Sequence, residues 1–107
     1  MDRVSVLILS MNKVAYTRAC LDSLLPTDGV ELEVVVVDNG STDGSLEMLD
    51  LMTEDFSDAG HQLVYHANDR NVGCCTGRNQ ALEMSTGDYC VFMDNDIYVG
   101  GSHWLTK

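Results

Sequence analysis

Four consecutive valines, Val34 to Val37, constrain the fold of this 107-residue chain more than any other feature. β-Branched residues favour strands. A strand that carries no polar alternation is buried on both faces, which is typical of parallel sheets covered by helices. The valine run therefore predicts the centre of a parallel sheet.

Other apolar runs of strand length alternate with segments of helical periodicity. Strands are expected over residues 4–9, 33–37, 62–66 and 89–93, and helices over 17–24, 46–56 and 74–86. Asn12 is a candidate N-cap for the first helix and Gly87 a C-cap for the third. The alternation predicts an α/β fold, a Rossmann-like, mostly parallel sheet of about four strands with helices on both faces.

The Asn39-Gly40 pair after the valines is also a strong hairpin signal. No strand pattern returns after it, however. Leu46, Leu49 and Met52 recur instead at helical spacing, with Asp43 or Ser45 available as the N-cap. We therefore interpret this stretch as a strand-to-helix loop.

Two carboxylates close the last apolar run, residues 89–93. Asp94 and Asp96 stand one residue apart where the strand ends. Burying an unpaired carboxylate is costly, so packing does not explain them. Two hard oxygen ligands suit Mg²⁺ or Mn²⁺, especially when a phosphate shares the ion. An ordinary polar turn is the alternative interpretation.

Polar loops also follow the other expected strands. They are Ser10-Met11-Asn12, the stretch from Asp38 to Ser45, and Asn71-Val72-Gly73, which leads into a helix carrying Arg78 and Asn79. Helix N-termini favour phosphate, and arginine offers a two-pronged donor for it. Together the loops indicate an anion site at one edge of the sheet.

These motifs, in this order, resemble the nucleotide-binding half of family 2 glycosyltransferases with the GT-A fold. The resemblance covers nearly the whole chain. It implies transfer of a glycosyl group from a nucleoside-diphosphate sugar, usually a UDP-sugar, to an acceptor that the sequence does not define. Asp38 would hydrogen-bond the base near Ser10 to Asn12, Asp94 would lie near the ribose, and Arg78 would support the phosphates. The implied nucleotide-binding residues are Ser10, Asn12, Asp38, Arg78 and Asp94, and the implied metal ligands are Asp96 and Asp94.

The sequence departs from the family pattern in two respects. Cys74, Cys75 and Gly77 replace residues that are often aromatic, apolar or alanine, and Gly77 costs helix propensity. The acidic catalytic base and the acceptor-binding half would follow Lys107. We therefore expect a domain truncated at its C-terminus that binds the donor but does not transfer sugar alone.

Charge and cysteine usage limit the partners and the compartment. A net charge of −11 argues against nucleic acid as a partner. The four cysteines form no CxxC pair, and the spacing of cysteines and histidines does not suit zinc. A reduced, cytoplasmic protein is expected.

Three alternatives remain open at this point. A nucleotidyltransferase shares the sheet architecture, although Ser10-Met11-Asn12-Lys13 is not its Gly- and basic-rich loop. A phosphatase of the haloacid-dehalogenase type also uses Asp-x-Asp, but near the start of its domain. A non-catalytic phosphate- or metal-binding module, assembling as a homodimer through an exposed sheet edge, is the third.

Overall fold

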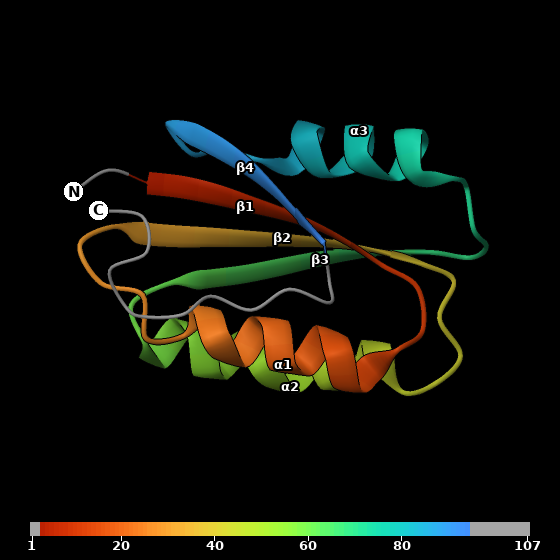
Figure 1. The fold of residues 1–107 in the computed structure, drawn as a ribbon, viewed down its shortest axis with the longest axis horizontal. Coiled ribbons are helices and arrows are strands. Elements are labelled where there is room, and N and C mark those ends of the chain that lie inside the picture. Colours follow the sequence, from red (N-terminus) through yellow and green to blue (C-terminus); the bar gives the residue numbers. More distant parts are fainter. Residues whose placement is uncertain (1–2, 95–107) are drawn as a thin grey trace.

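A computed structural model describes residues 3–94 as one parallel sheet with helices on both faces (Figure 1). The strand order is β3-β2-β1-β4, and every neighbouring pair is parallel. This confirms the Rossmann-like α/β fold expected from the sequence. In chain order the elements are β1 (Arg3–Ser10), α1 (Val14–Leu24), β2 (Glu31–Asn39), α2 (Ser45–Asp58), β3 (Gln62–Asn68), α3 (Cys74–Met84) and β4 (Tyr89–Asp94).

The valine run forms the buried centre of β2, as predicted. All four side chains are fully buried. Val34 and Val36 face a core built with α1 and α2, whereas Val35 and Val37 face a smaller core under α3. Apolar burial on both faces therefore fixes β2 inside the sheet.

The helices α1 and α2 pack on the sheet through the apolar residues that recur at helical spacing in the sequence. The buried face of α1 consists of Thr17, Cys20, Leu21 and Leu24, as the spacing predicted. α3 lies alone on the opposite face, where Gly77 and Ala81 are its buried residues. Gly77 is closely packed, because an added Cβ would lie 2.5 Å from Leu9 Cδ1 and would require the Leu9 side chain to move. Close packing thus accounts for a residue that weakens the helix.

The order of the strands reverses once. The chain runs outward from β1 through β2 to β3, and α3 then leads to β4 on the other side of β1. α1 and α2 lie on one face of the sheet and α3 on the other (Figure 1). The reversal point therefore lies between β1 and β4.

A buried carboxylate, Glu33, joins the strands near their amino ends. It accepts hydrogen bonds from Ser5 Oγ at 2.8 Å, from Thr86 N–H and Oγ1 at 2.7 Å each, and from Arg3 Nη2 at 3.3 Å. Burial alone would raise the pKa of Glu33, but the Thr86 and Ser5 hydrogen bonds and the Arg3 charge outweigh it and hold this pKa below its ordinary value. Arg3 also donates to Gln62 on β3.

The third helix ends differently from the expectation. It stops at Met84 with Ser85 as its C-cap residue in an extended conformation, so the prediction of Gly87 as the C-cap is wrong. Gly87 has a different role. A Cβ at this position would lie 2.8 Å from Ser5 N and 2.9 Å from Arg3 O, so only glycine lets the turn pass this close to β1.

All four cysteines are free thiols, as expected. Cys20 is fully buried in the core, but Cys90 is exposed rather than packed as a small hydrophobe. The reason is that, within residues 3–94, β4 is an edge strand and α3 is the only helix on that face of the sheet. The further strand and helix expected after Asp96 lie outside the described residues. Within residues 3–94, the helices lack the length and apolar character that a membrane span requires.

Candidate functional site

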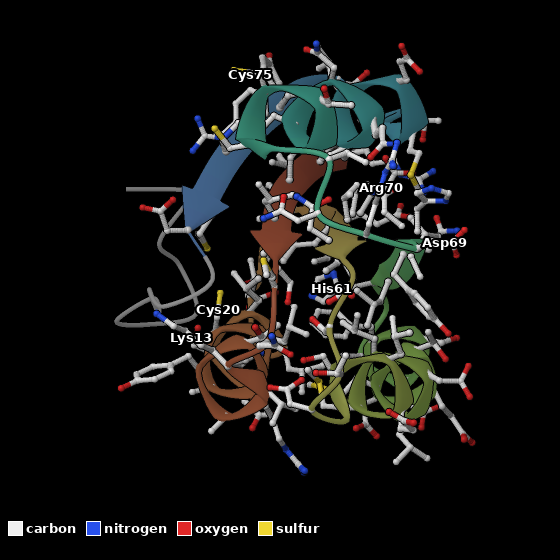
Figure 2. All side chains as sticks on the ribbon, turned by 90° about the vertical axis from the view of Figure 1, so that its right-hand side faces the viewer. Lys13, Cys20, His61, Asp69, Arg70 and Cys75 are labelled. Atoms are coloured by element: carbon white, nitrogen blue, oxygen red, sulfur yellow. The ribbon has the colours of Figure 1, made fainter. Side chains whose placement is uncertain are left out.

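Three loops and the end of β4 lie together at the carboxyl edge of the sheet. The loops follow Ser10, Asn39 and Asn68, and β4 ends at Asp94. Figure 2 faces this edge, with α3 above the sheet and α1 and α2 below it. Open α/β sheets bind ligands outside the carboxyl ends of their strands, where the strand order reverses. The region around the ends of β1 and β4 is therefore the candidate site.

Side chains fasten the loop after β1 to the loop after β2. Asn12 N–H donates to Ser41 Oγ at 2.6 Å, and Asn12 Oδ1 accepts from Thr42 N–H at 2.8 Å. The prediction that Asn12 caps α1 is wrong, because its amide is engaged across the loops and Lys13 holds the cap position. Both residues have positive φ, 56° and 58°, which is rare outside glycine. Fixed contacts thus hold a strained loop beside the site.

Asp43 acts at the start of two helices. Its Oδ2 accepts from Val14 N–H at 2.9 Å, the first amide of α1. Its Oδ1 accepts from the Oγ and the N–H of Ser45, the first residue of α2. The hydrogen bond from the Ser45 hydroxyl is the main reason that the pKa of Asp43 lies below its ordinary value. This geometry supports a capping role rather than a ligand role.

A cleft of about 240 Å³ opens between the ends of β1 and β2 and the start of α3. We call it the Asn39 cleft. It carries a fully buried hydroxyl, Ser10, together with a cationic side chain, Lys13. Figure 2 shows Lys13 on this edge, near the start of α1. The lining residues are Leu9, Ser10, Met11, Lys13, Asn39, Asn71 and Cys74.

Asp38 does not line this cleft. Its side chain is fully buried, and its carboxylate accepts from Ser41 N–H at 2.8 Å and from Ser41 Oγ at 2.5 Å. These bonds shape the turn that begins at Gly40, where φ is +81° and an added Cβ would lie 3.0 Å from Arg70 Cα. Asp38 thus stabilises the loop in this structure, and base recognition by Asp38 stays a prediction.

A second cavity, of about 400 Å³, lies on the α3 side of β1 and β4. We call it the Arg78 cavity. Arg78 Nη2 lies 3.9 Å from Asp94 Oδ1, and both side chains are mostly exposed. Leu9 lines both this cavity and the Asn39 cleft, so the two adjoin. The lining residues are Leu7, Ile8, Leu9, Arg78, Phe92, Met93 and Asp94.

The expected metal ligands are only partly described. Asp94 ends β4 with its side chain 70% exposed, whereas Asp96 lies outside the described residues. Over residues 3–94, the acids, histidines and cysteines form no cluster of three or more that could hold an ion. Metal binding by Asp94 and Asp96 therefore stays a prediction.

The structure thus divides the expected nucleotide-binding residues. Ser10 lines the Asn39 cleft, and Arg78 with Asp94 lines the adjoining cavity. Asn12 and Asp38 fasten the loops instead. The other polar residues of the cleft, Lys13, Asn39 and Asn71, were not among the expected nucleotide-binding residues. Their position at or shortly after strand ends was the available signal, because such residues gather at the carboxyl edge.

The parallel sheet defines a Rossmann-like α/β domain, and the two adjoining cavities at its carboxyl edge form a candidate ligand site at the strand reversal. The sequence pattern of glycosyl transferase family 2 matches residues 5–107. The chain belongs to this family, which confirms the resemblance drawn from its motifs.

Glycosyltransferases of several bacteria contain similar sequences. The chain is 34% identical over 98 residues to glycosyltransferase GlyA of Streptococcus pneumoniae, a match that covers 92% of the chain and 13% of GlyA. It is 43% identical over 67 residues to the uncharacterized glycosyltransferase YfnE of Bacillus subtilis, covering 63% of the chain and 16% of YfnE. The chain therefore spans only a small part of these relatives.

Two solved structures share the fold closely. S. aureus TarS 1-349 in complex with UDP-GlcNAc aligns with a TM-score of 0.79 and 31% identity, over 90% of this chain and 27% of that one. The mannosyltransferase PcManGT from Pyrobaculum calidifontis, in complex with GDP-Man and Mn²⁺, aligns with a TM-score of 0.84 and 29% identity, over 94% and 29%. These likenesses confirm the GT-A type of fold.

Proposed function

We propose that this chain is the donor-binding region of a glycosyltransferase, and that it binds a nucleoside-diphosphate sugar with the help of a divalent cation. The observation that carries the proposal is the pair of adjoining cavities at the strand reversal, in a chain of glycosyl transferase family 2. Solved relatives with this fold hold UDP-GlcNAc, or GDP-Man with Mn²⁺. A UDP-sugar is the first candidate donor.

The two cavities suit different parts of such a donor. The Asn39 cleft has amide groups, a cationic side chain and apolar walls, a mixture that suits a nucleoside, while the buried Ser10 hydroxyl lies 3.3 Å from Thr17 Oγ1. The Arg78 cavity joins a guanidinium and a carboxylate at its rim. A diphosphate reaching from the cleft toward Asp94 would meet both groups. Leu9 lines both cavities, so a ligand that occupies both would pass over this side chain.

Asp94 and Asp96 are proposed as the metal ligands, with Mg²⁺ or Mn²⁺ as the ion. When bound, the cation supplies a Lewis acid that stabilises the negative charge of the departing diphosphate. Arg78 is held by a single long ion pair between two exposed side chains, which is worth little. Its guanidinium is therefore free to turn from Asp94 to a phosphate when a cation takes the carboxylate.

The charge distribution supports an anionic ligand that arrives with a cation. The chain has only six Lys and Arg residues against seventeen Asp and Glu. Two of the six, Lys13 and Arg78, line the Asn39 cleft and the Arg78 cavity. The positive charge of an acidic protein is thus present where a diphosphate would lie, and a divalent ion would offset the remaining repulsion.

Calorimetric titration with UDP, in the presence and absence of Mn²⁺, tests the proposal. We expect binding that strengthens at least tenfold with the metal. The variant Asp94→Asn should lose most of this gain, because an amide is a poor ligand for a hard cation. Asp58→Asn is the matched control, since Asp58 is an exposed residue at the end of α2. Absence of heat with UDP, GDP and their sugars, from protein shown to be folded by circular dichroism, would overturn the proposal.

A further inference from the structure

A relay of hydrogen bonds leads from the carboxylate of Asp38 to the loop that carries Lys13. Asp38 is fully buried, and its Oδ1 lies 2.5 Å from Ser41 Oγ. The same Ser41 Oγ lies 2.6 Å from the backbone nitrogen of Asn12, the residue before Lys13. Ser41 thus connects the loop after β2 to the loop after β1 through a single hydroxyl group.

The chemistry of the three groups determines the direction of each hydrogen bond in this relay. A carboxylate can only accept a hydrogen bond, and a backbone N–H can only donate one. The Ser41 hydroxyl must therefore donate to Asp38 and accept from Asn12. Loss of the hydroxyl would remove a partner from the buried carboxylate and from the Asn12 N–H at the same time.

The loop that the relay holds has a strained backbone. Asn12 and Lys13 have φ values of 56° and 58°, in the left-handed region that residues with a Cβ rarely adopt. Such residues keep their conformation only where surrounding contacts determine it. The contacts here are the Ser41 bond, a 2.8 Å bond from Thr42 N–H to Asn12 Oδ1, and the first backbone hydrogen bonds of α1, which the Lys13 carbonyl accepts. Both sides of the Lys13 backbone are therefore held, which limits the directions that its side chain can take.

Lys13 is a cation without a carboxylate partner in an acidic chain. It lines the Asn39 cleft, which adjoins the Arg78 cavity, and it lies at the carboxyl edge that Figure 2 faces. In the part of the chain that the structure describes, carboxylates form ion pairs with arginines but not with Lys13. The charge of this lysine is therefore available to an anionic ligand, and phosphate is a common partner of lysine.

We propose that Ser41 is a positioning residue whose hydroxyl fixes the strained loop, so that the Lys13 ammonium group donates to the diphosphate of the donor where it leaves the Asn39 cleft. Ser41 does not touch the ligand and acts through Lys13. The inference rests on the proposed function, since it assumes that a nucleoside diphosphate occupies the two adjoining cavities.

A double-mutant cycle of Ser41→Ala and Lys13→Met tests whether Ser41 acts through Lys13. The readout is the dissociation constant of UDP in the presence of Mn²⁺, measured by calorimetry on the full chain. Lys13→Met removes the charge with little change in length and should weaken binding about tenfold, since one charge-assisted hydrogen bond is lost. Ser41→Ala should weaken binding about fivefold when Lys13 is present, and less than about twofold in combination with Lys13→Met.

Thr42→Ala is the matched control, because Thr42 is an exposed neighbour that contributes its backbone N–H to the loop. It should leave the affinity for UDP unchanged, and a loss as large as that of Ser41→Ala would contradict the inference. Asn12→Gly removes the side-chain bond to Thr42, and glycine adopts a positive φ without strain. This variant should also weaken UDP binding, and it keeps the test valid if Ser41→Ala does not fold.

The outcomes separate the two proposals. If Ser41→Ala weakens UDP binding by the same factor with and without Lys13→Met, its role is merely structural and the inference is wrong. If Lys13→Met binds UDP as tightly as the wild type, the inference is wrong and the proposed function stands. If the folded wild type does not bind UDP, the proposed function fails and the inference fails with it. A loss that depends on Lys13 and is absent from the control supports the inference.

Discussion

Glu33 is a buried carboxylate that contacts two other segments of the chain. Its four hydrogen bonds tie β2 to β1 and to the turn before β4. The apolar pattern placed Glu33 at the start of a strand, but nothing in the sequence indicated its partners. Thr86 lies 53 positions away in the chain, and only the folded sheet brings the two together.

The variant Glu33→Gln should destabilise the domain at neutral pH by about 1–3 kcal/mol, because its amide would set a donor against the donors of Thr86 or Arg3. The pKa of Glu33 is lowered in the fold, so its stabilisation is present above the ordinary value of 4.5 and is lost as the pH falls through the native pKa. The difference in unfolding free energy should therefore shrink below pH 4.5.

Urea unfolding between pH 3 and pH 7 measures this difference. Glu31→Gln is the control, because Glu31 is a neighbour on β2 that is 45% exposed and makes only a 4.0 Å contact with Arg3. A constant difference between wild type and Glu33→Gln across this range would show that the carboxylate charge does not matter.

Gly77 links helix packing to the site at the level of one residue. An alanine Cβ there would lie 2.5 Å from Leu9 Cδ1 and 3.3 Å from Asn39 Nδ2. Alanine gains up to about 1 kcal/mol in helix propensity, but overpacking costs about 1–3 kcal/mol. Gly77→Ala should thus be neutral to destabilising by about 2 kcal/mol. Because the displaced Leu9 lines both cavities, Gly77→Ala should also weaken UDP binding severalfold.

Thermal unfolding and calorimetry of Gly77→Ala check these two effects. Thr76→Ala, an exposed substitution on the same helix, should change neither quantity by much. A more stable variant with unchanged affinity would mean that Leu9 moves aside without disturbing the cleft.

The elements of this fold could be predicted well from the sequence because each carries a clear pattern. The valine run marked β2, and three- to four-residue spacing marked the buried faces of α1 and α2. The ends of the elements were less certain. The helix signals at Asn12 and Gly87 were misread, because long-range contacts with Thr42 and with β1 decide what these residues do.

The connection between α1 and α2 is the element-scale feature that the sequence did not reveal. Asp43 was expected to act near one helix, yet it binds the first amides of both. Asp43→Asn should therefore loosen the starts of α1 and α2 together. Hydrogen exchange at Val14 and Ser45 should speed up in the variant, while exchange in β2 stays slow.

The pKa of Asp43 is lowered, so its contribution should fade as the pH falls through that lowered value, below the ordinary 3.8. Asp69→Asn, in an exposed loop residue, is the control. Faster exchange at Ser45 alone would contradict the bridging role and would leave Asp43 as the cap of a single helix.

At the scale of the whole molecule, β4 is the outer strand of the sheet formed by the described residues. Phe92 is 52% exposed on the face where α3 is the only helix within residues 3–94, and Tyr89 is 61% exposed on the opposite face. Unpaired strand edges tend to join other strands. We therefore expect the 107-residue chain to form homodimers through β4. Light scattering at increasing concentration should show them, and Phe92→Lys should shift the population to monomer. A strict monomer would contradict this expectation.

The site is predictable from the sequence to the extent that topology determines it. Strand ends in a parallel sheet share one edge, so the loops after Ser10 and Asp38 and the end of β4 at Asp94 had to gather there. Which side chain faces a cavity depends on packing that the pattern does not contain. Asp38 accepts hydrogen bonds from Ser41 in the loop that follows β2, whereas its neighbour Asn39 lines the cleft.

The central claim is that a nucleoside diphosphate and a divalent cation bind together at the carboxyl edge. Paramagnetic broadening by Mn²⁺ in nuclear magnetic resonance spectra tests it most directly. With substoichiometric Mn²⁺ and saturating UDP, we predict that the amide signals of Asp94 and Arg78 broaden strongly. The signals of Glu33 and Thr86, at the amino edge, should stay sharp. Broadening that is the same with and without UDP, or that affects acidic residues evenly over the whole surface, would contradict the claim.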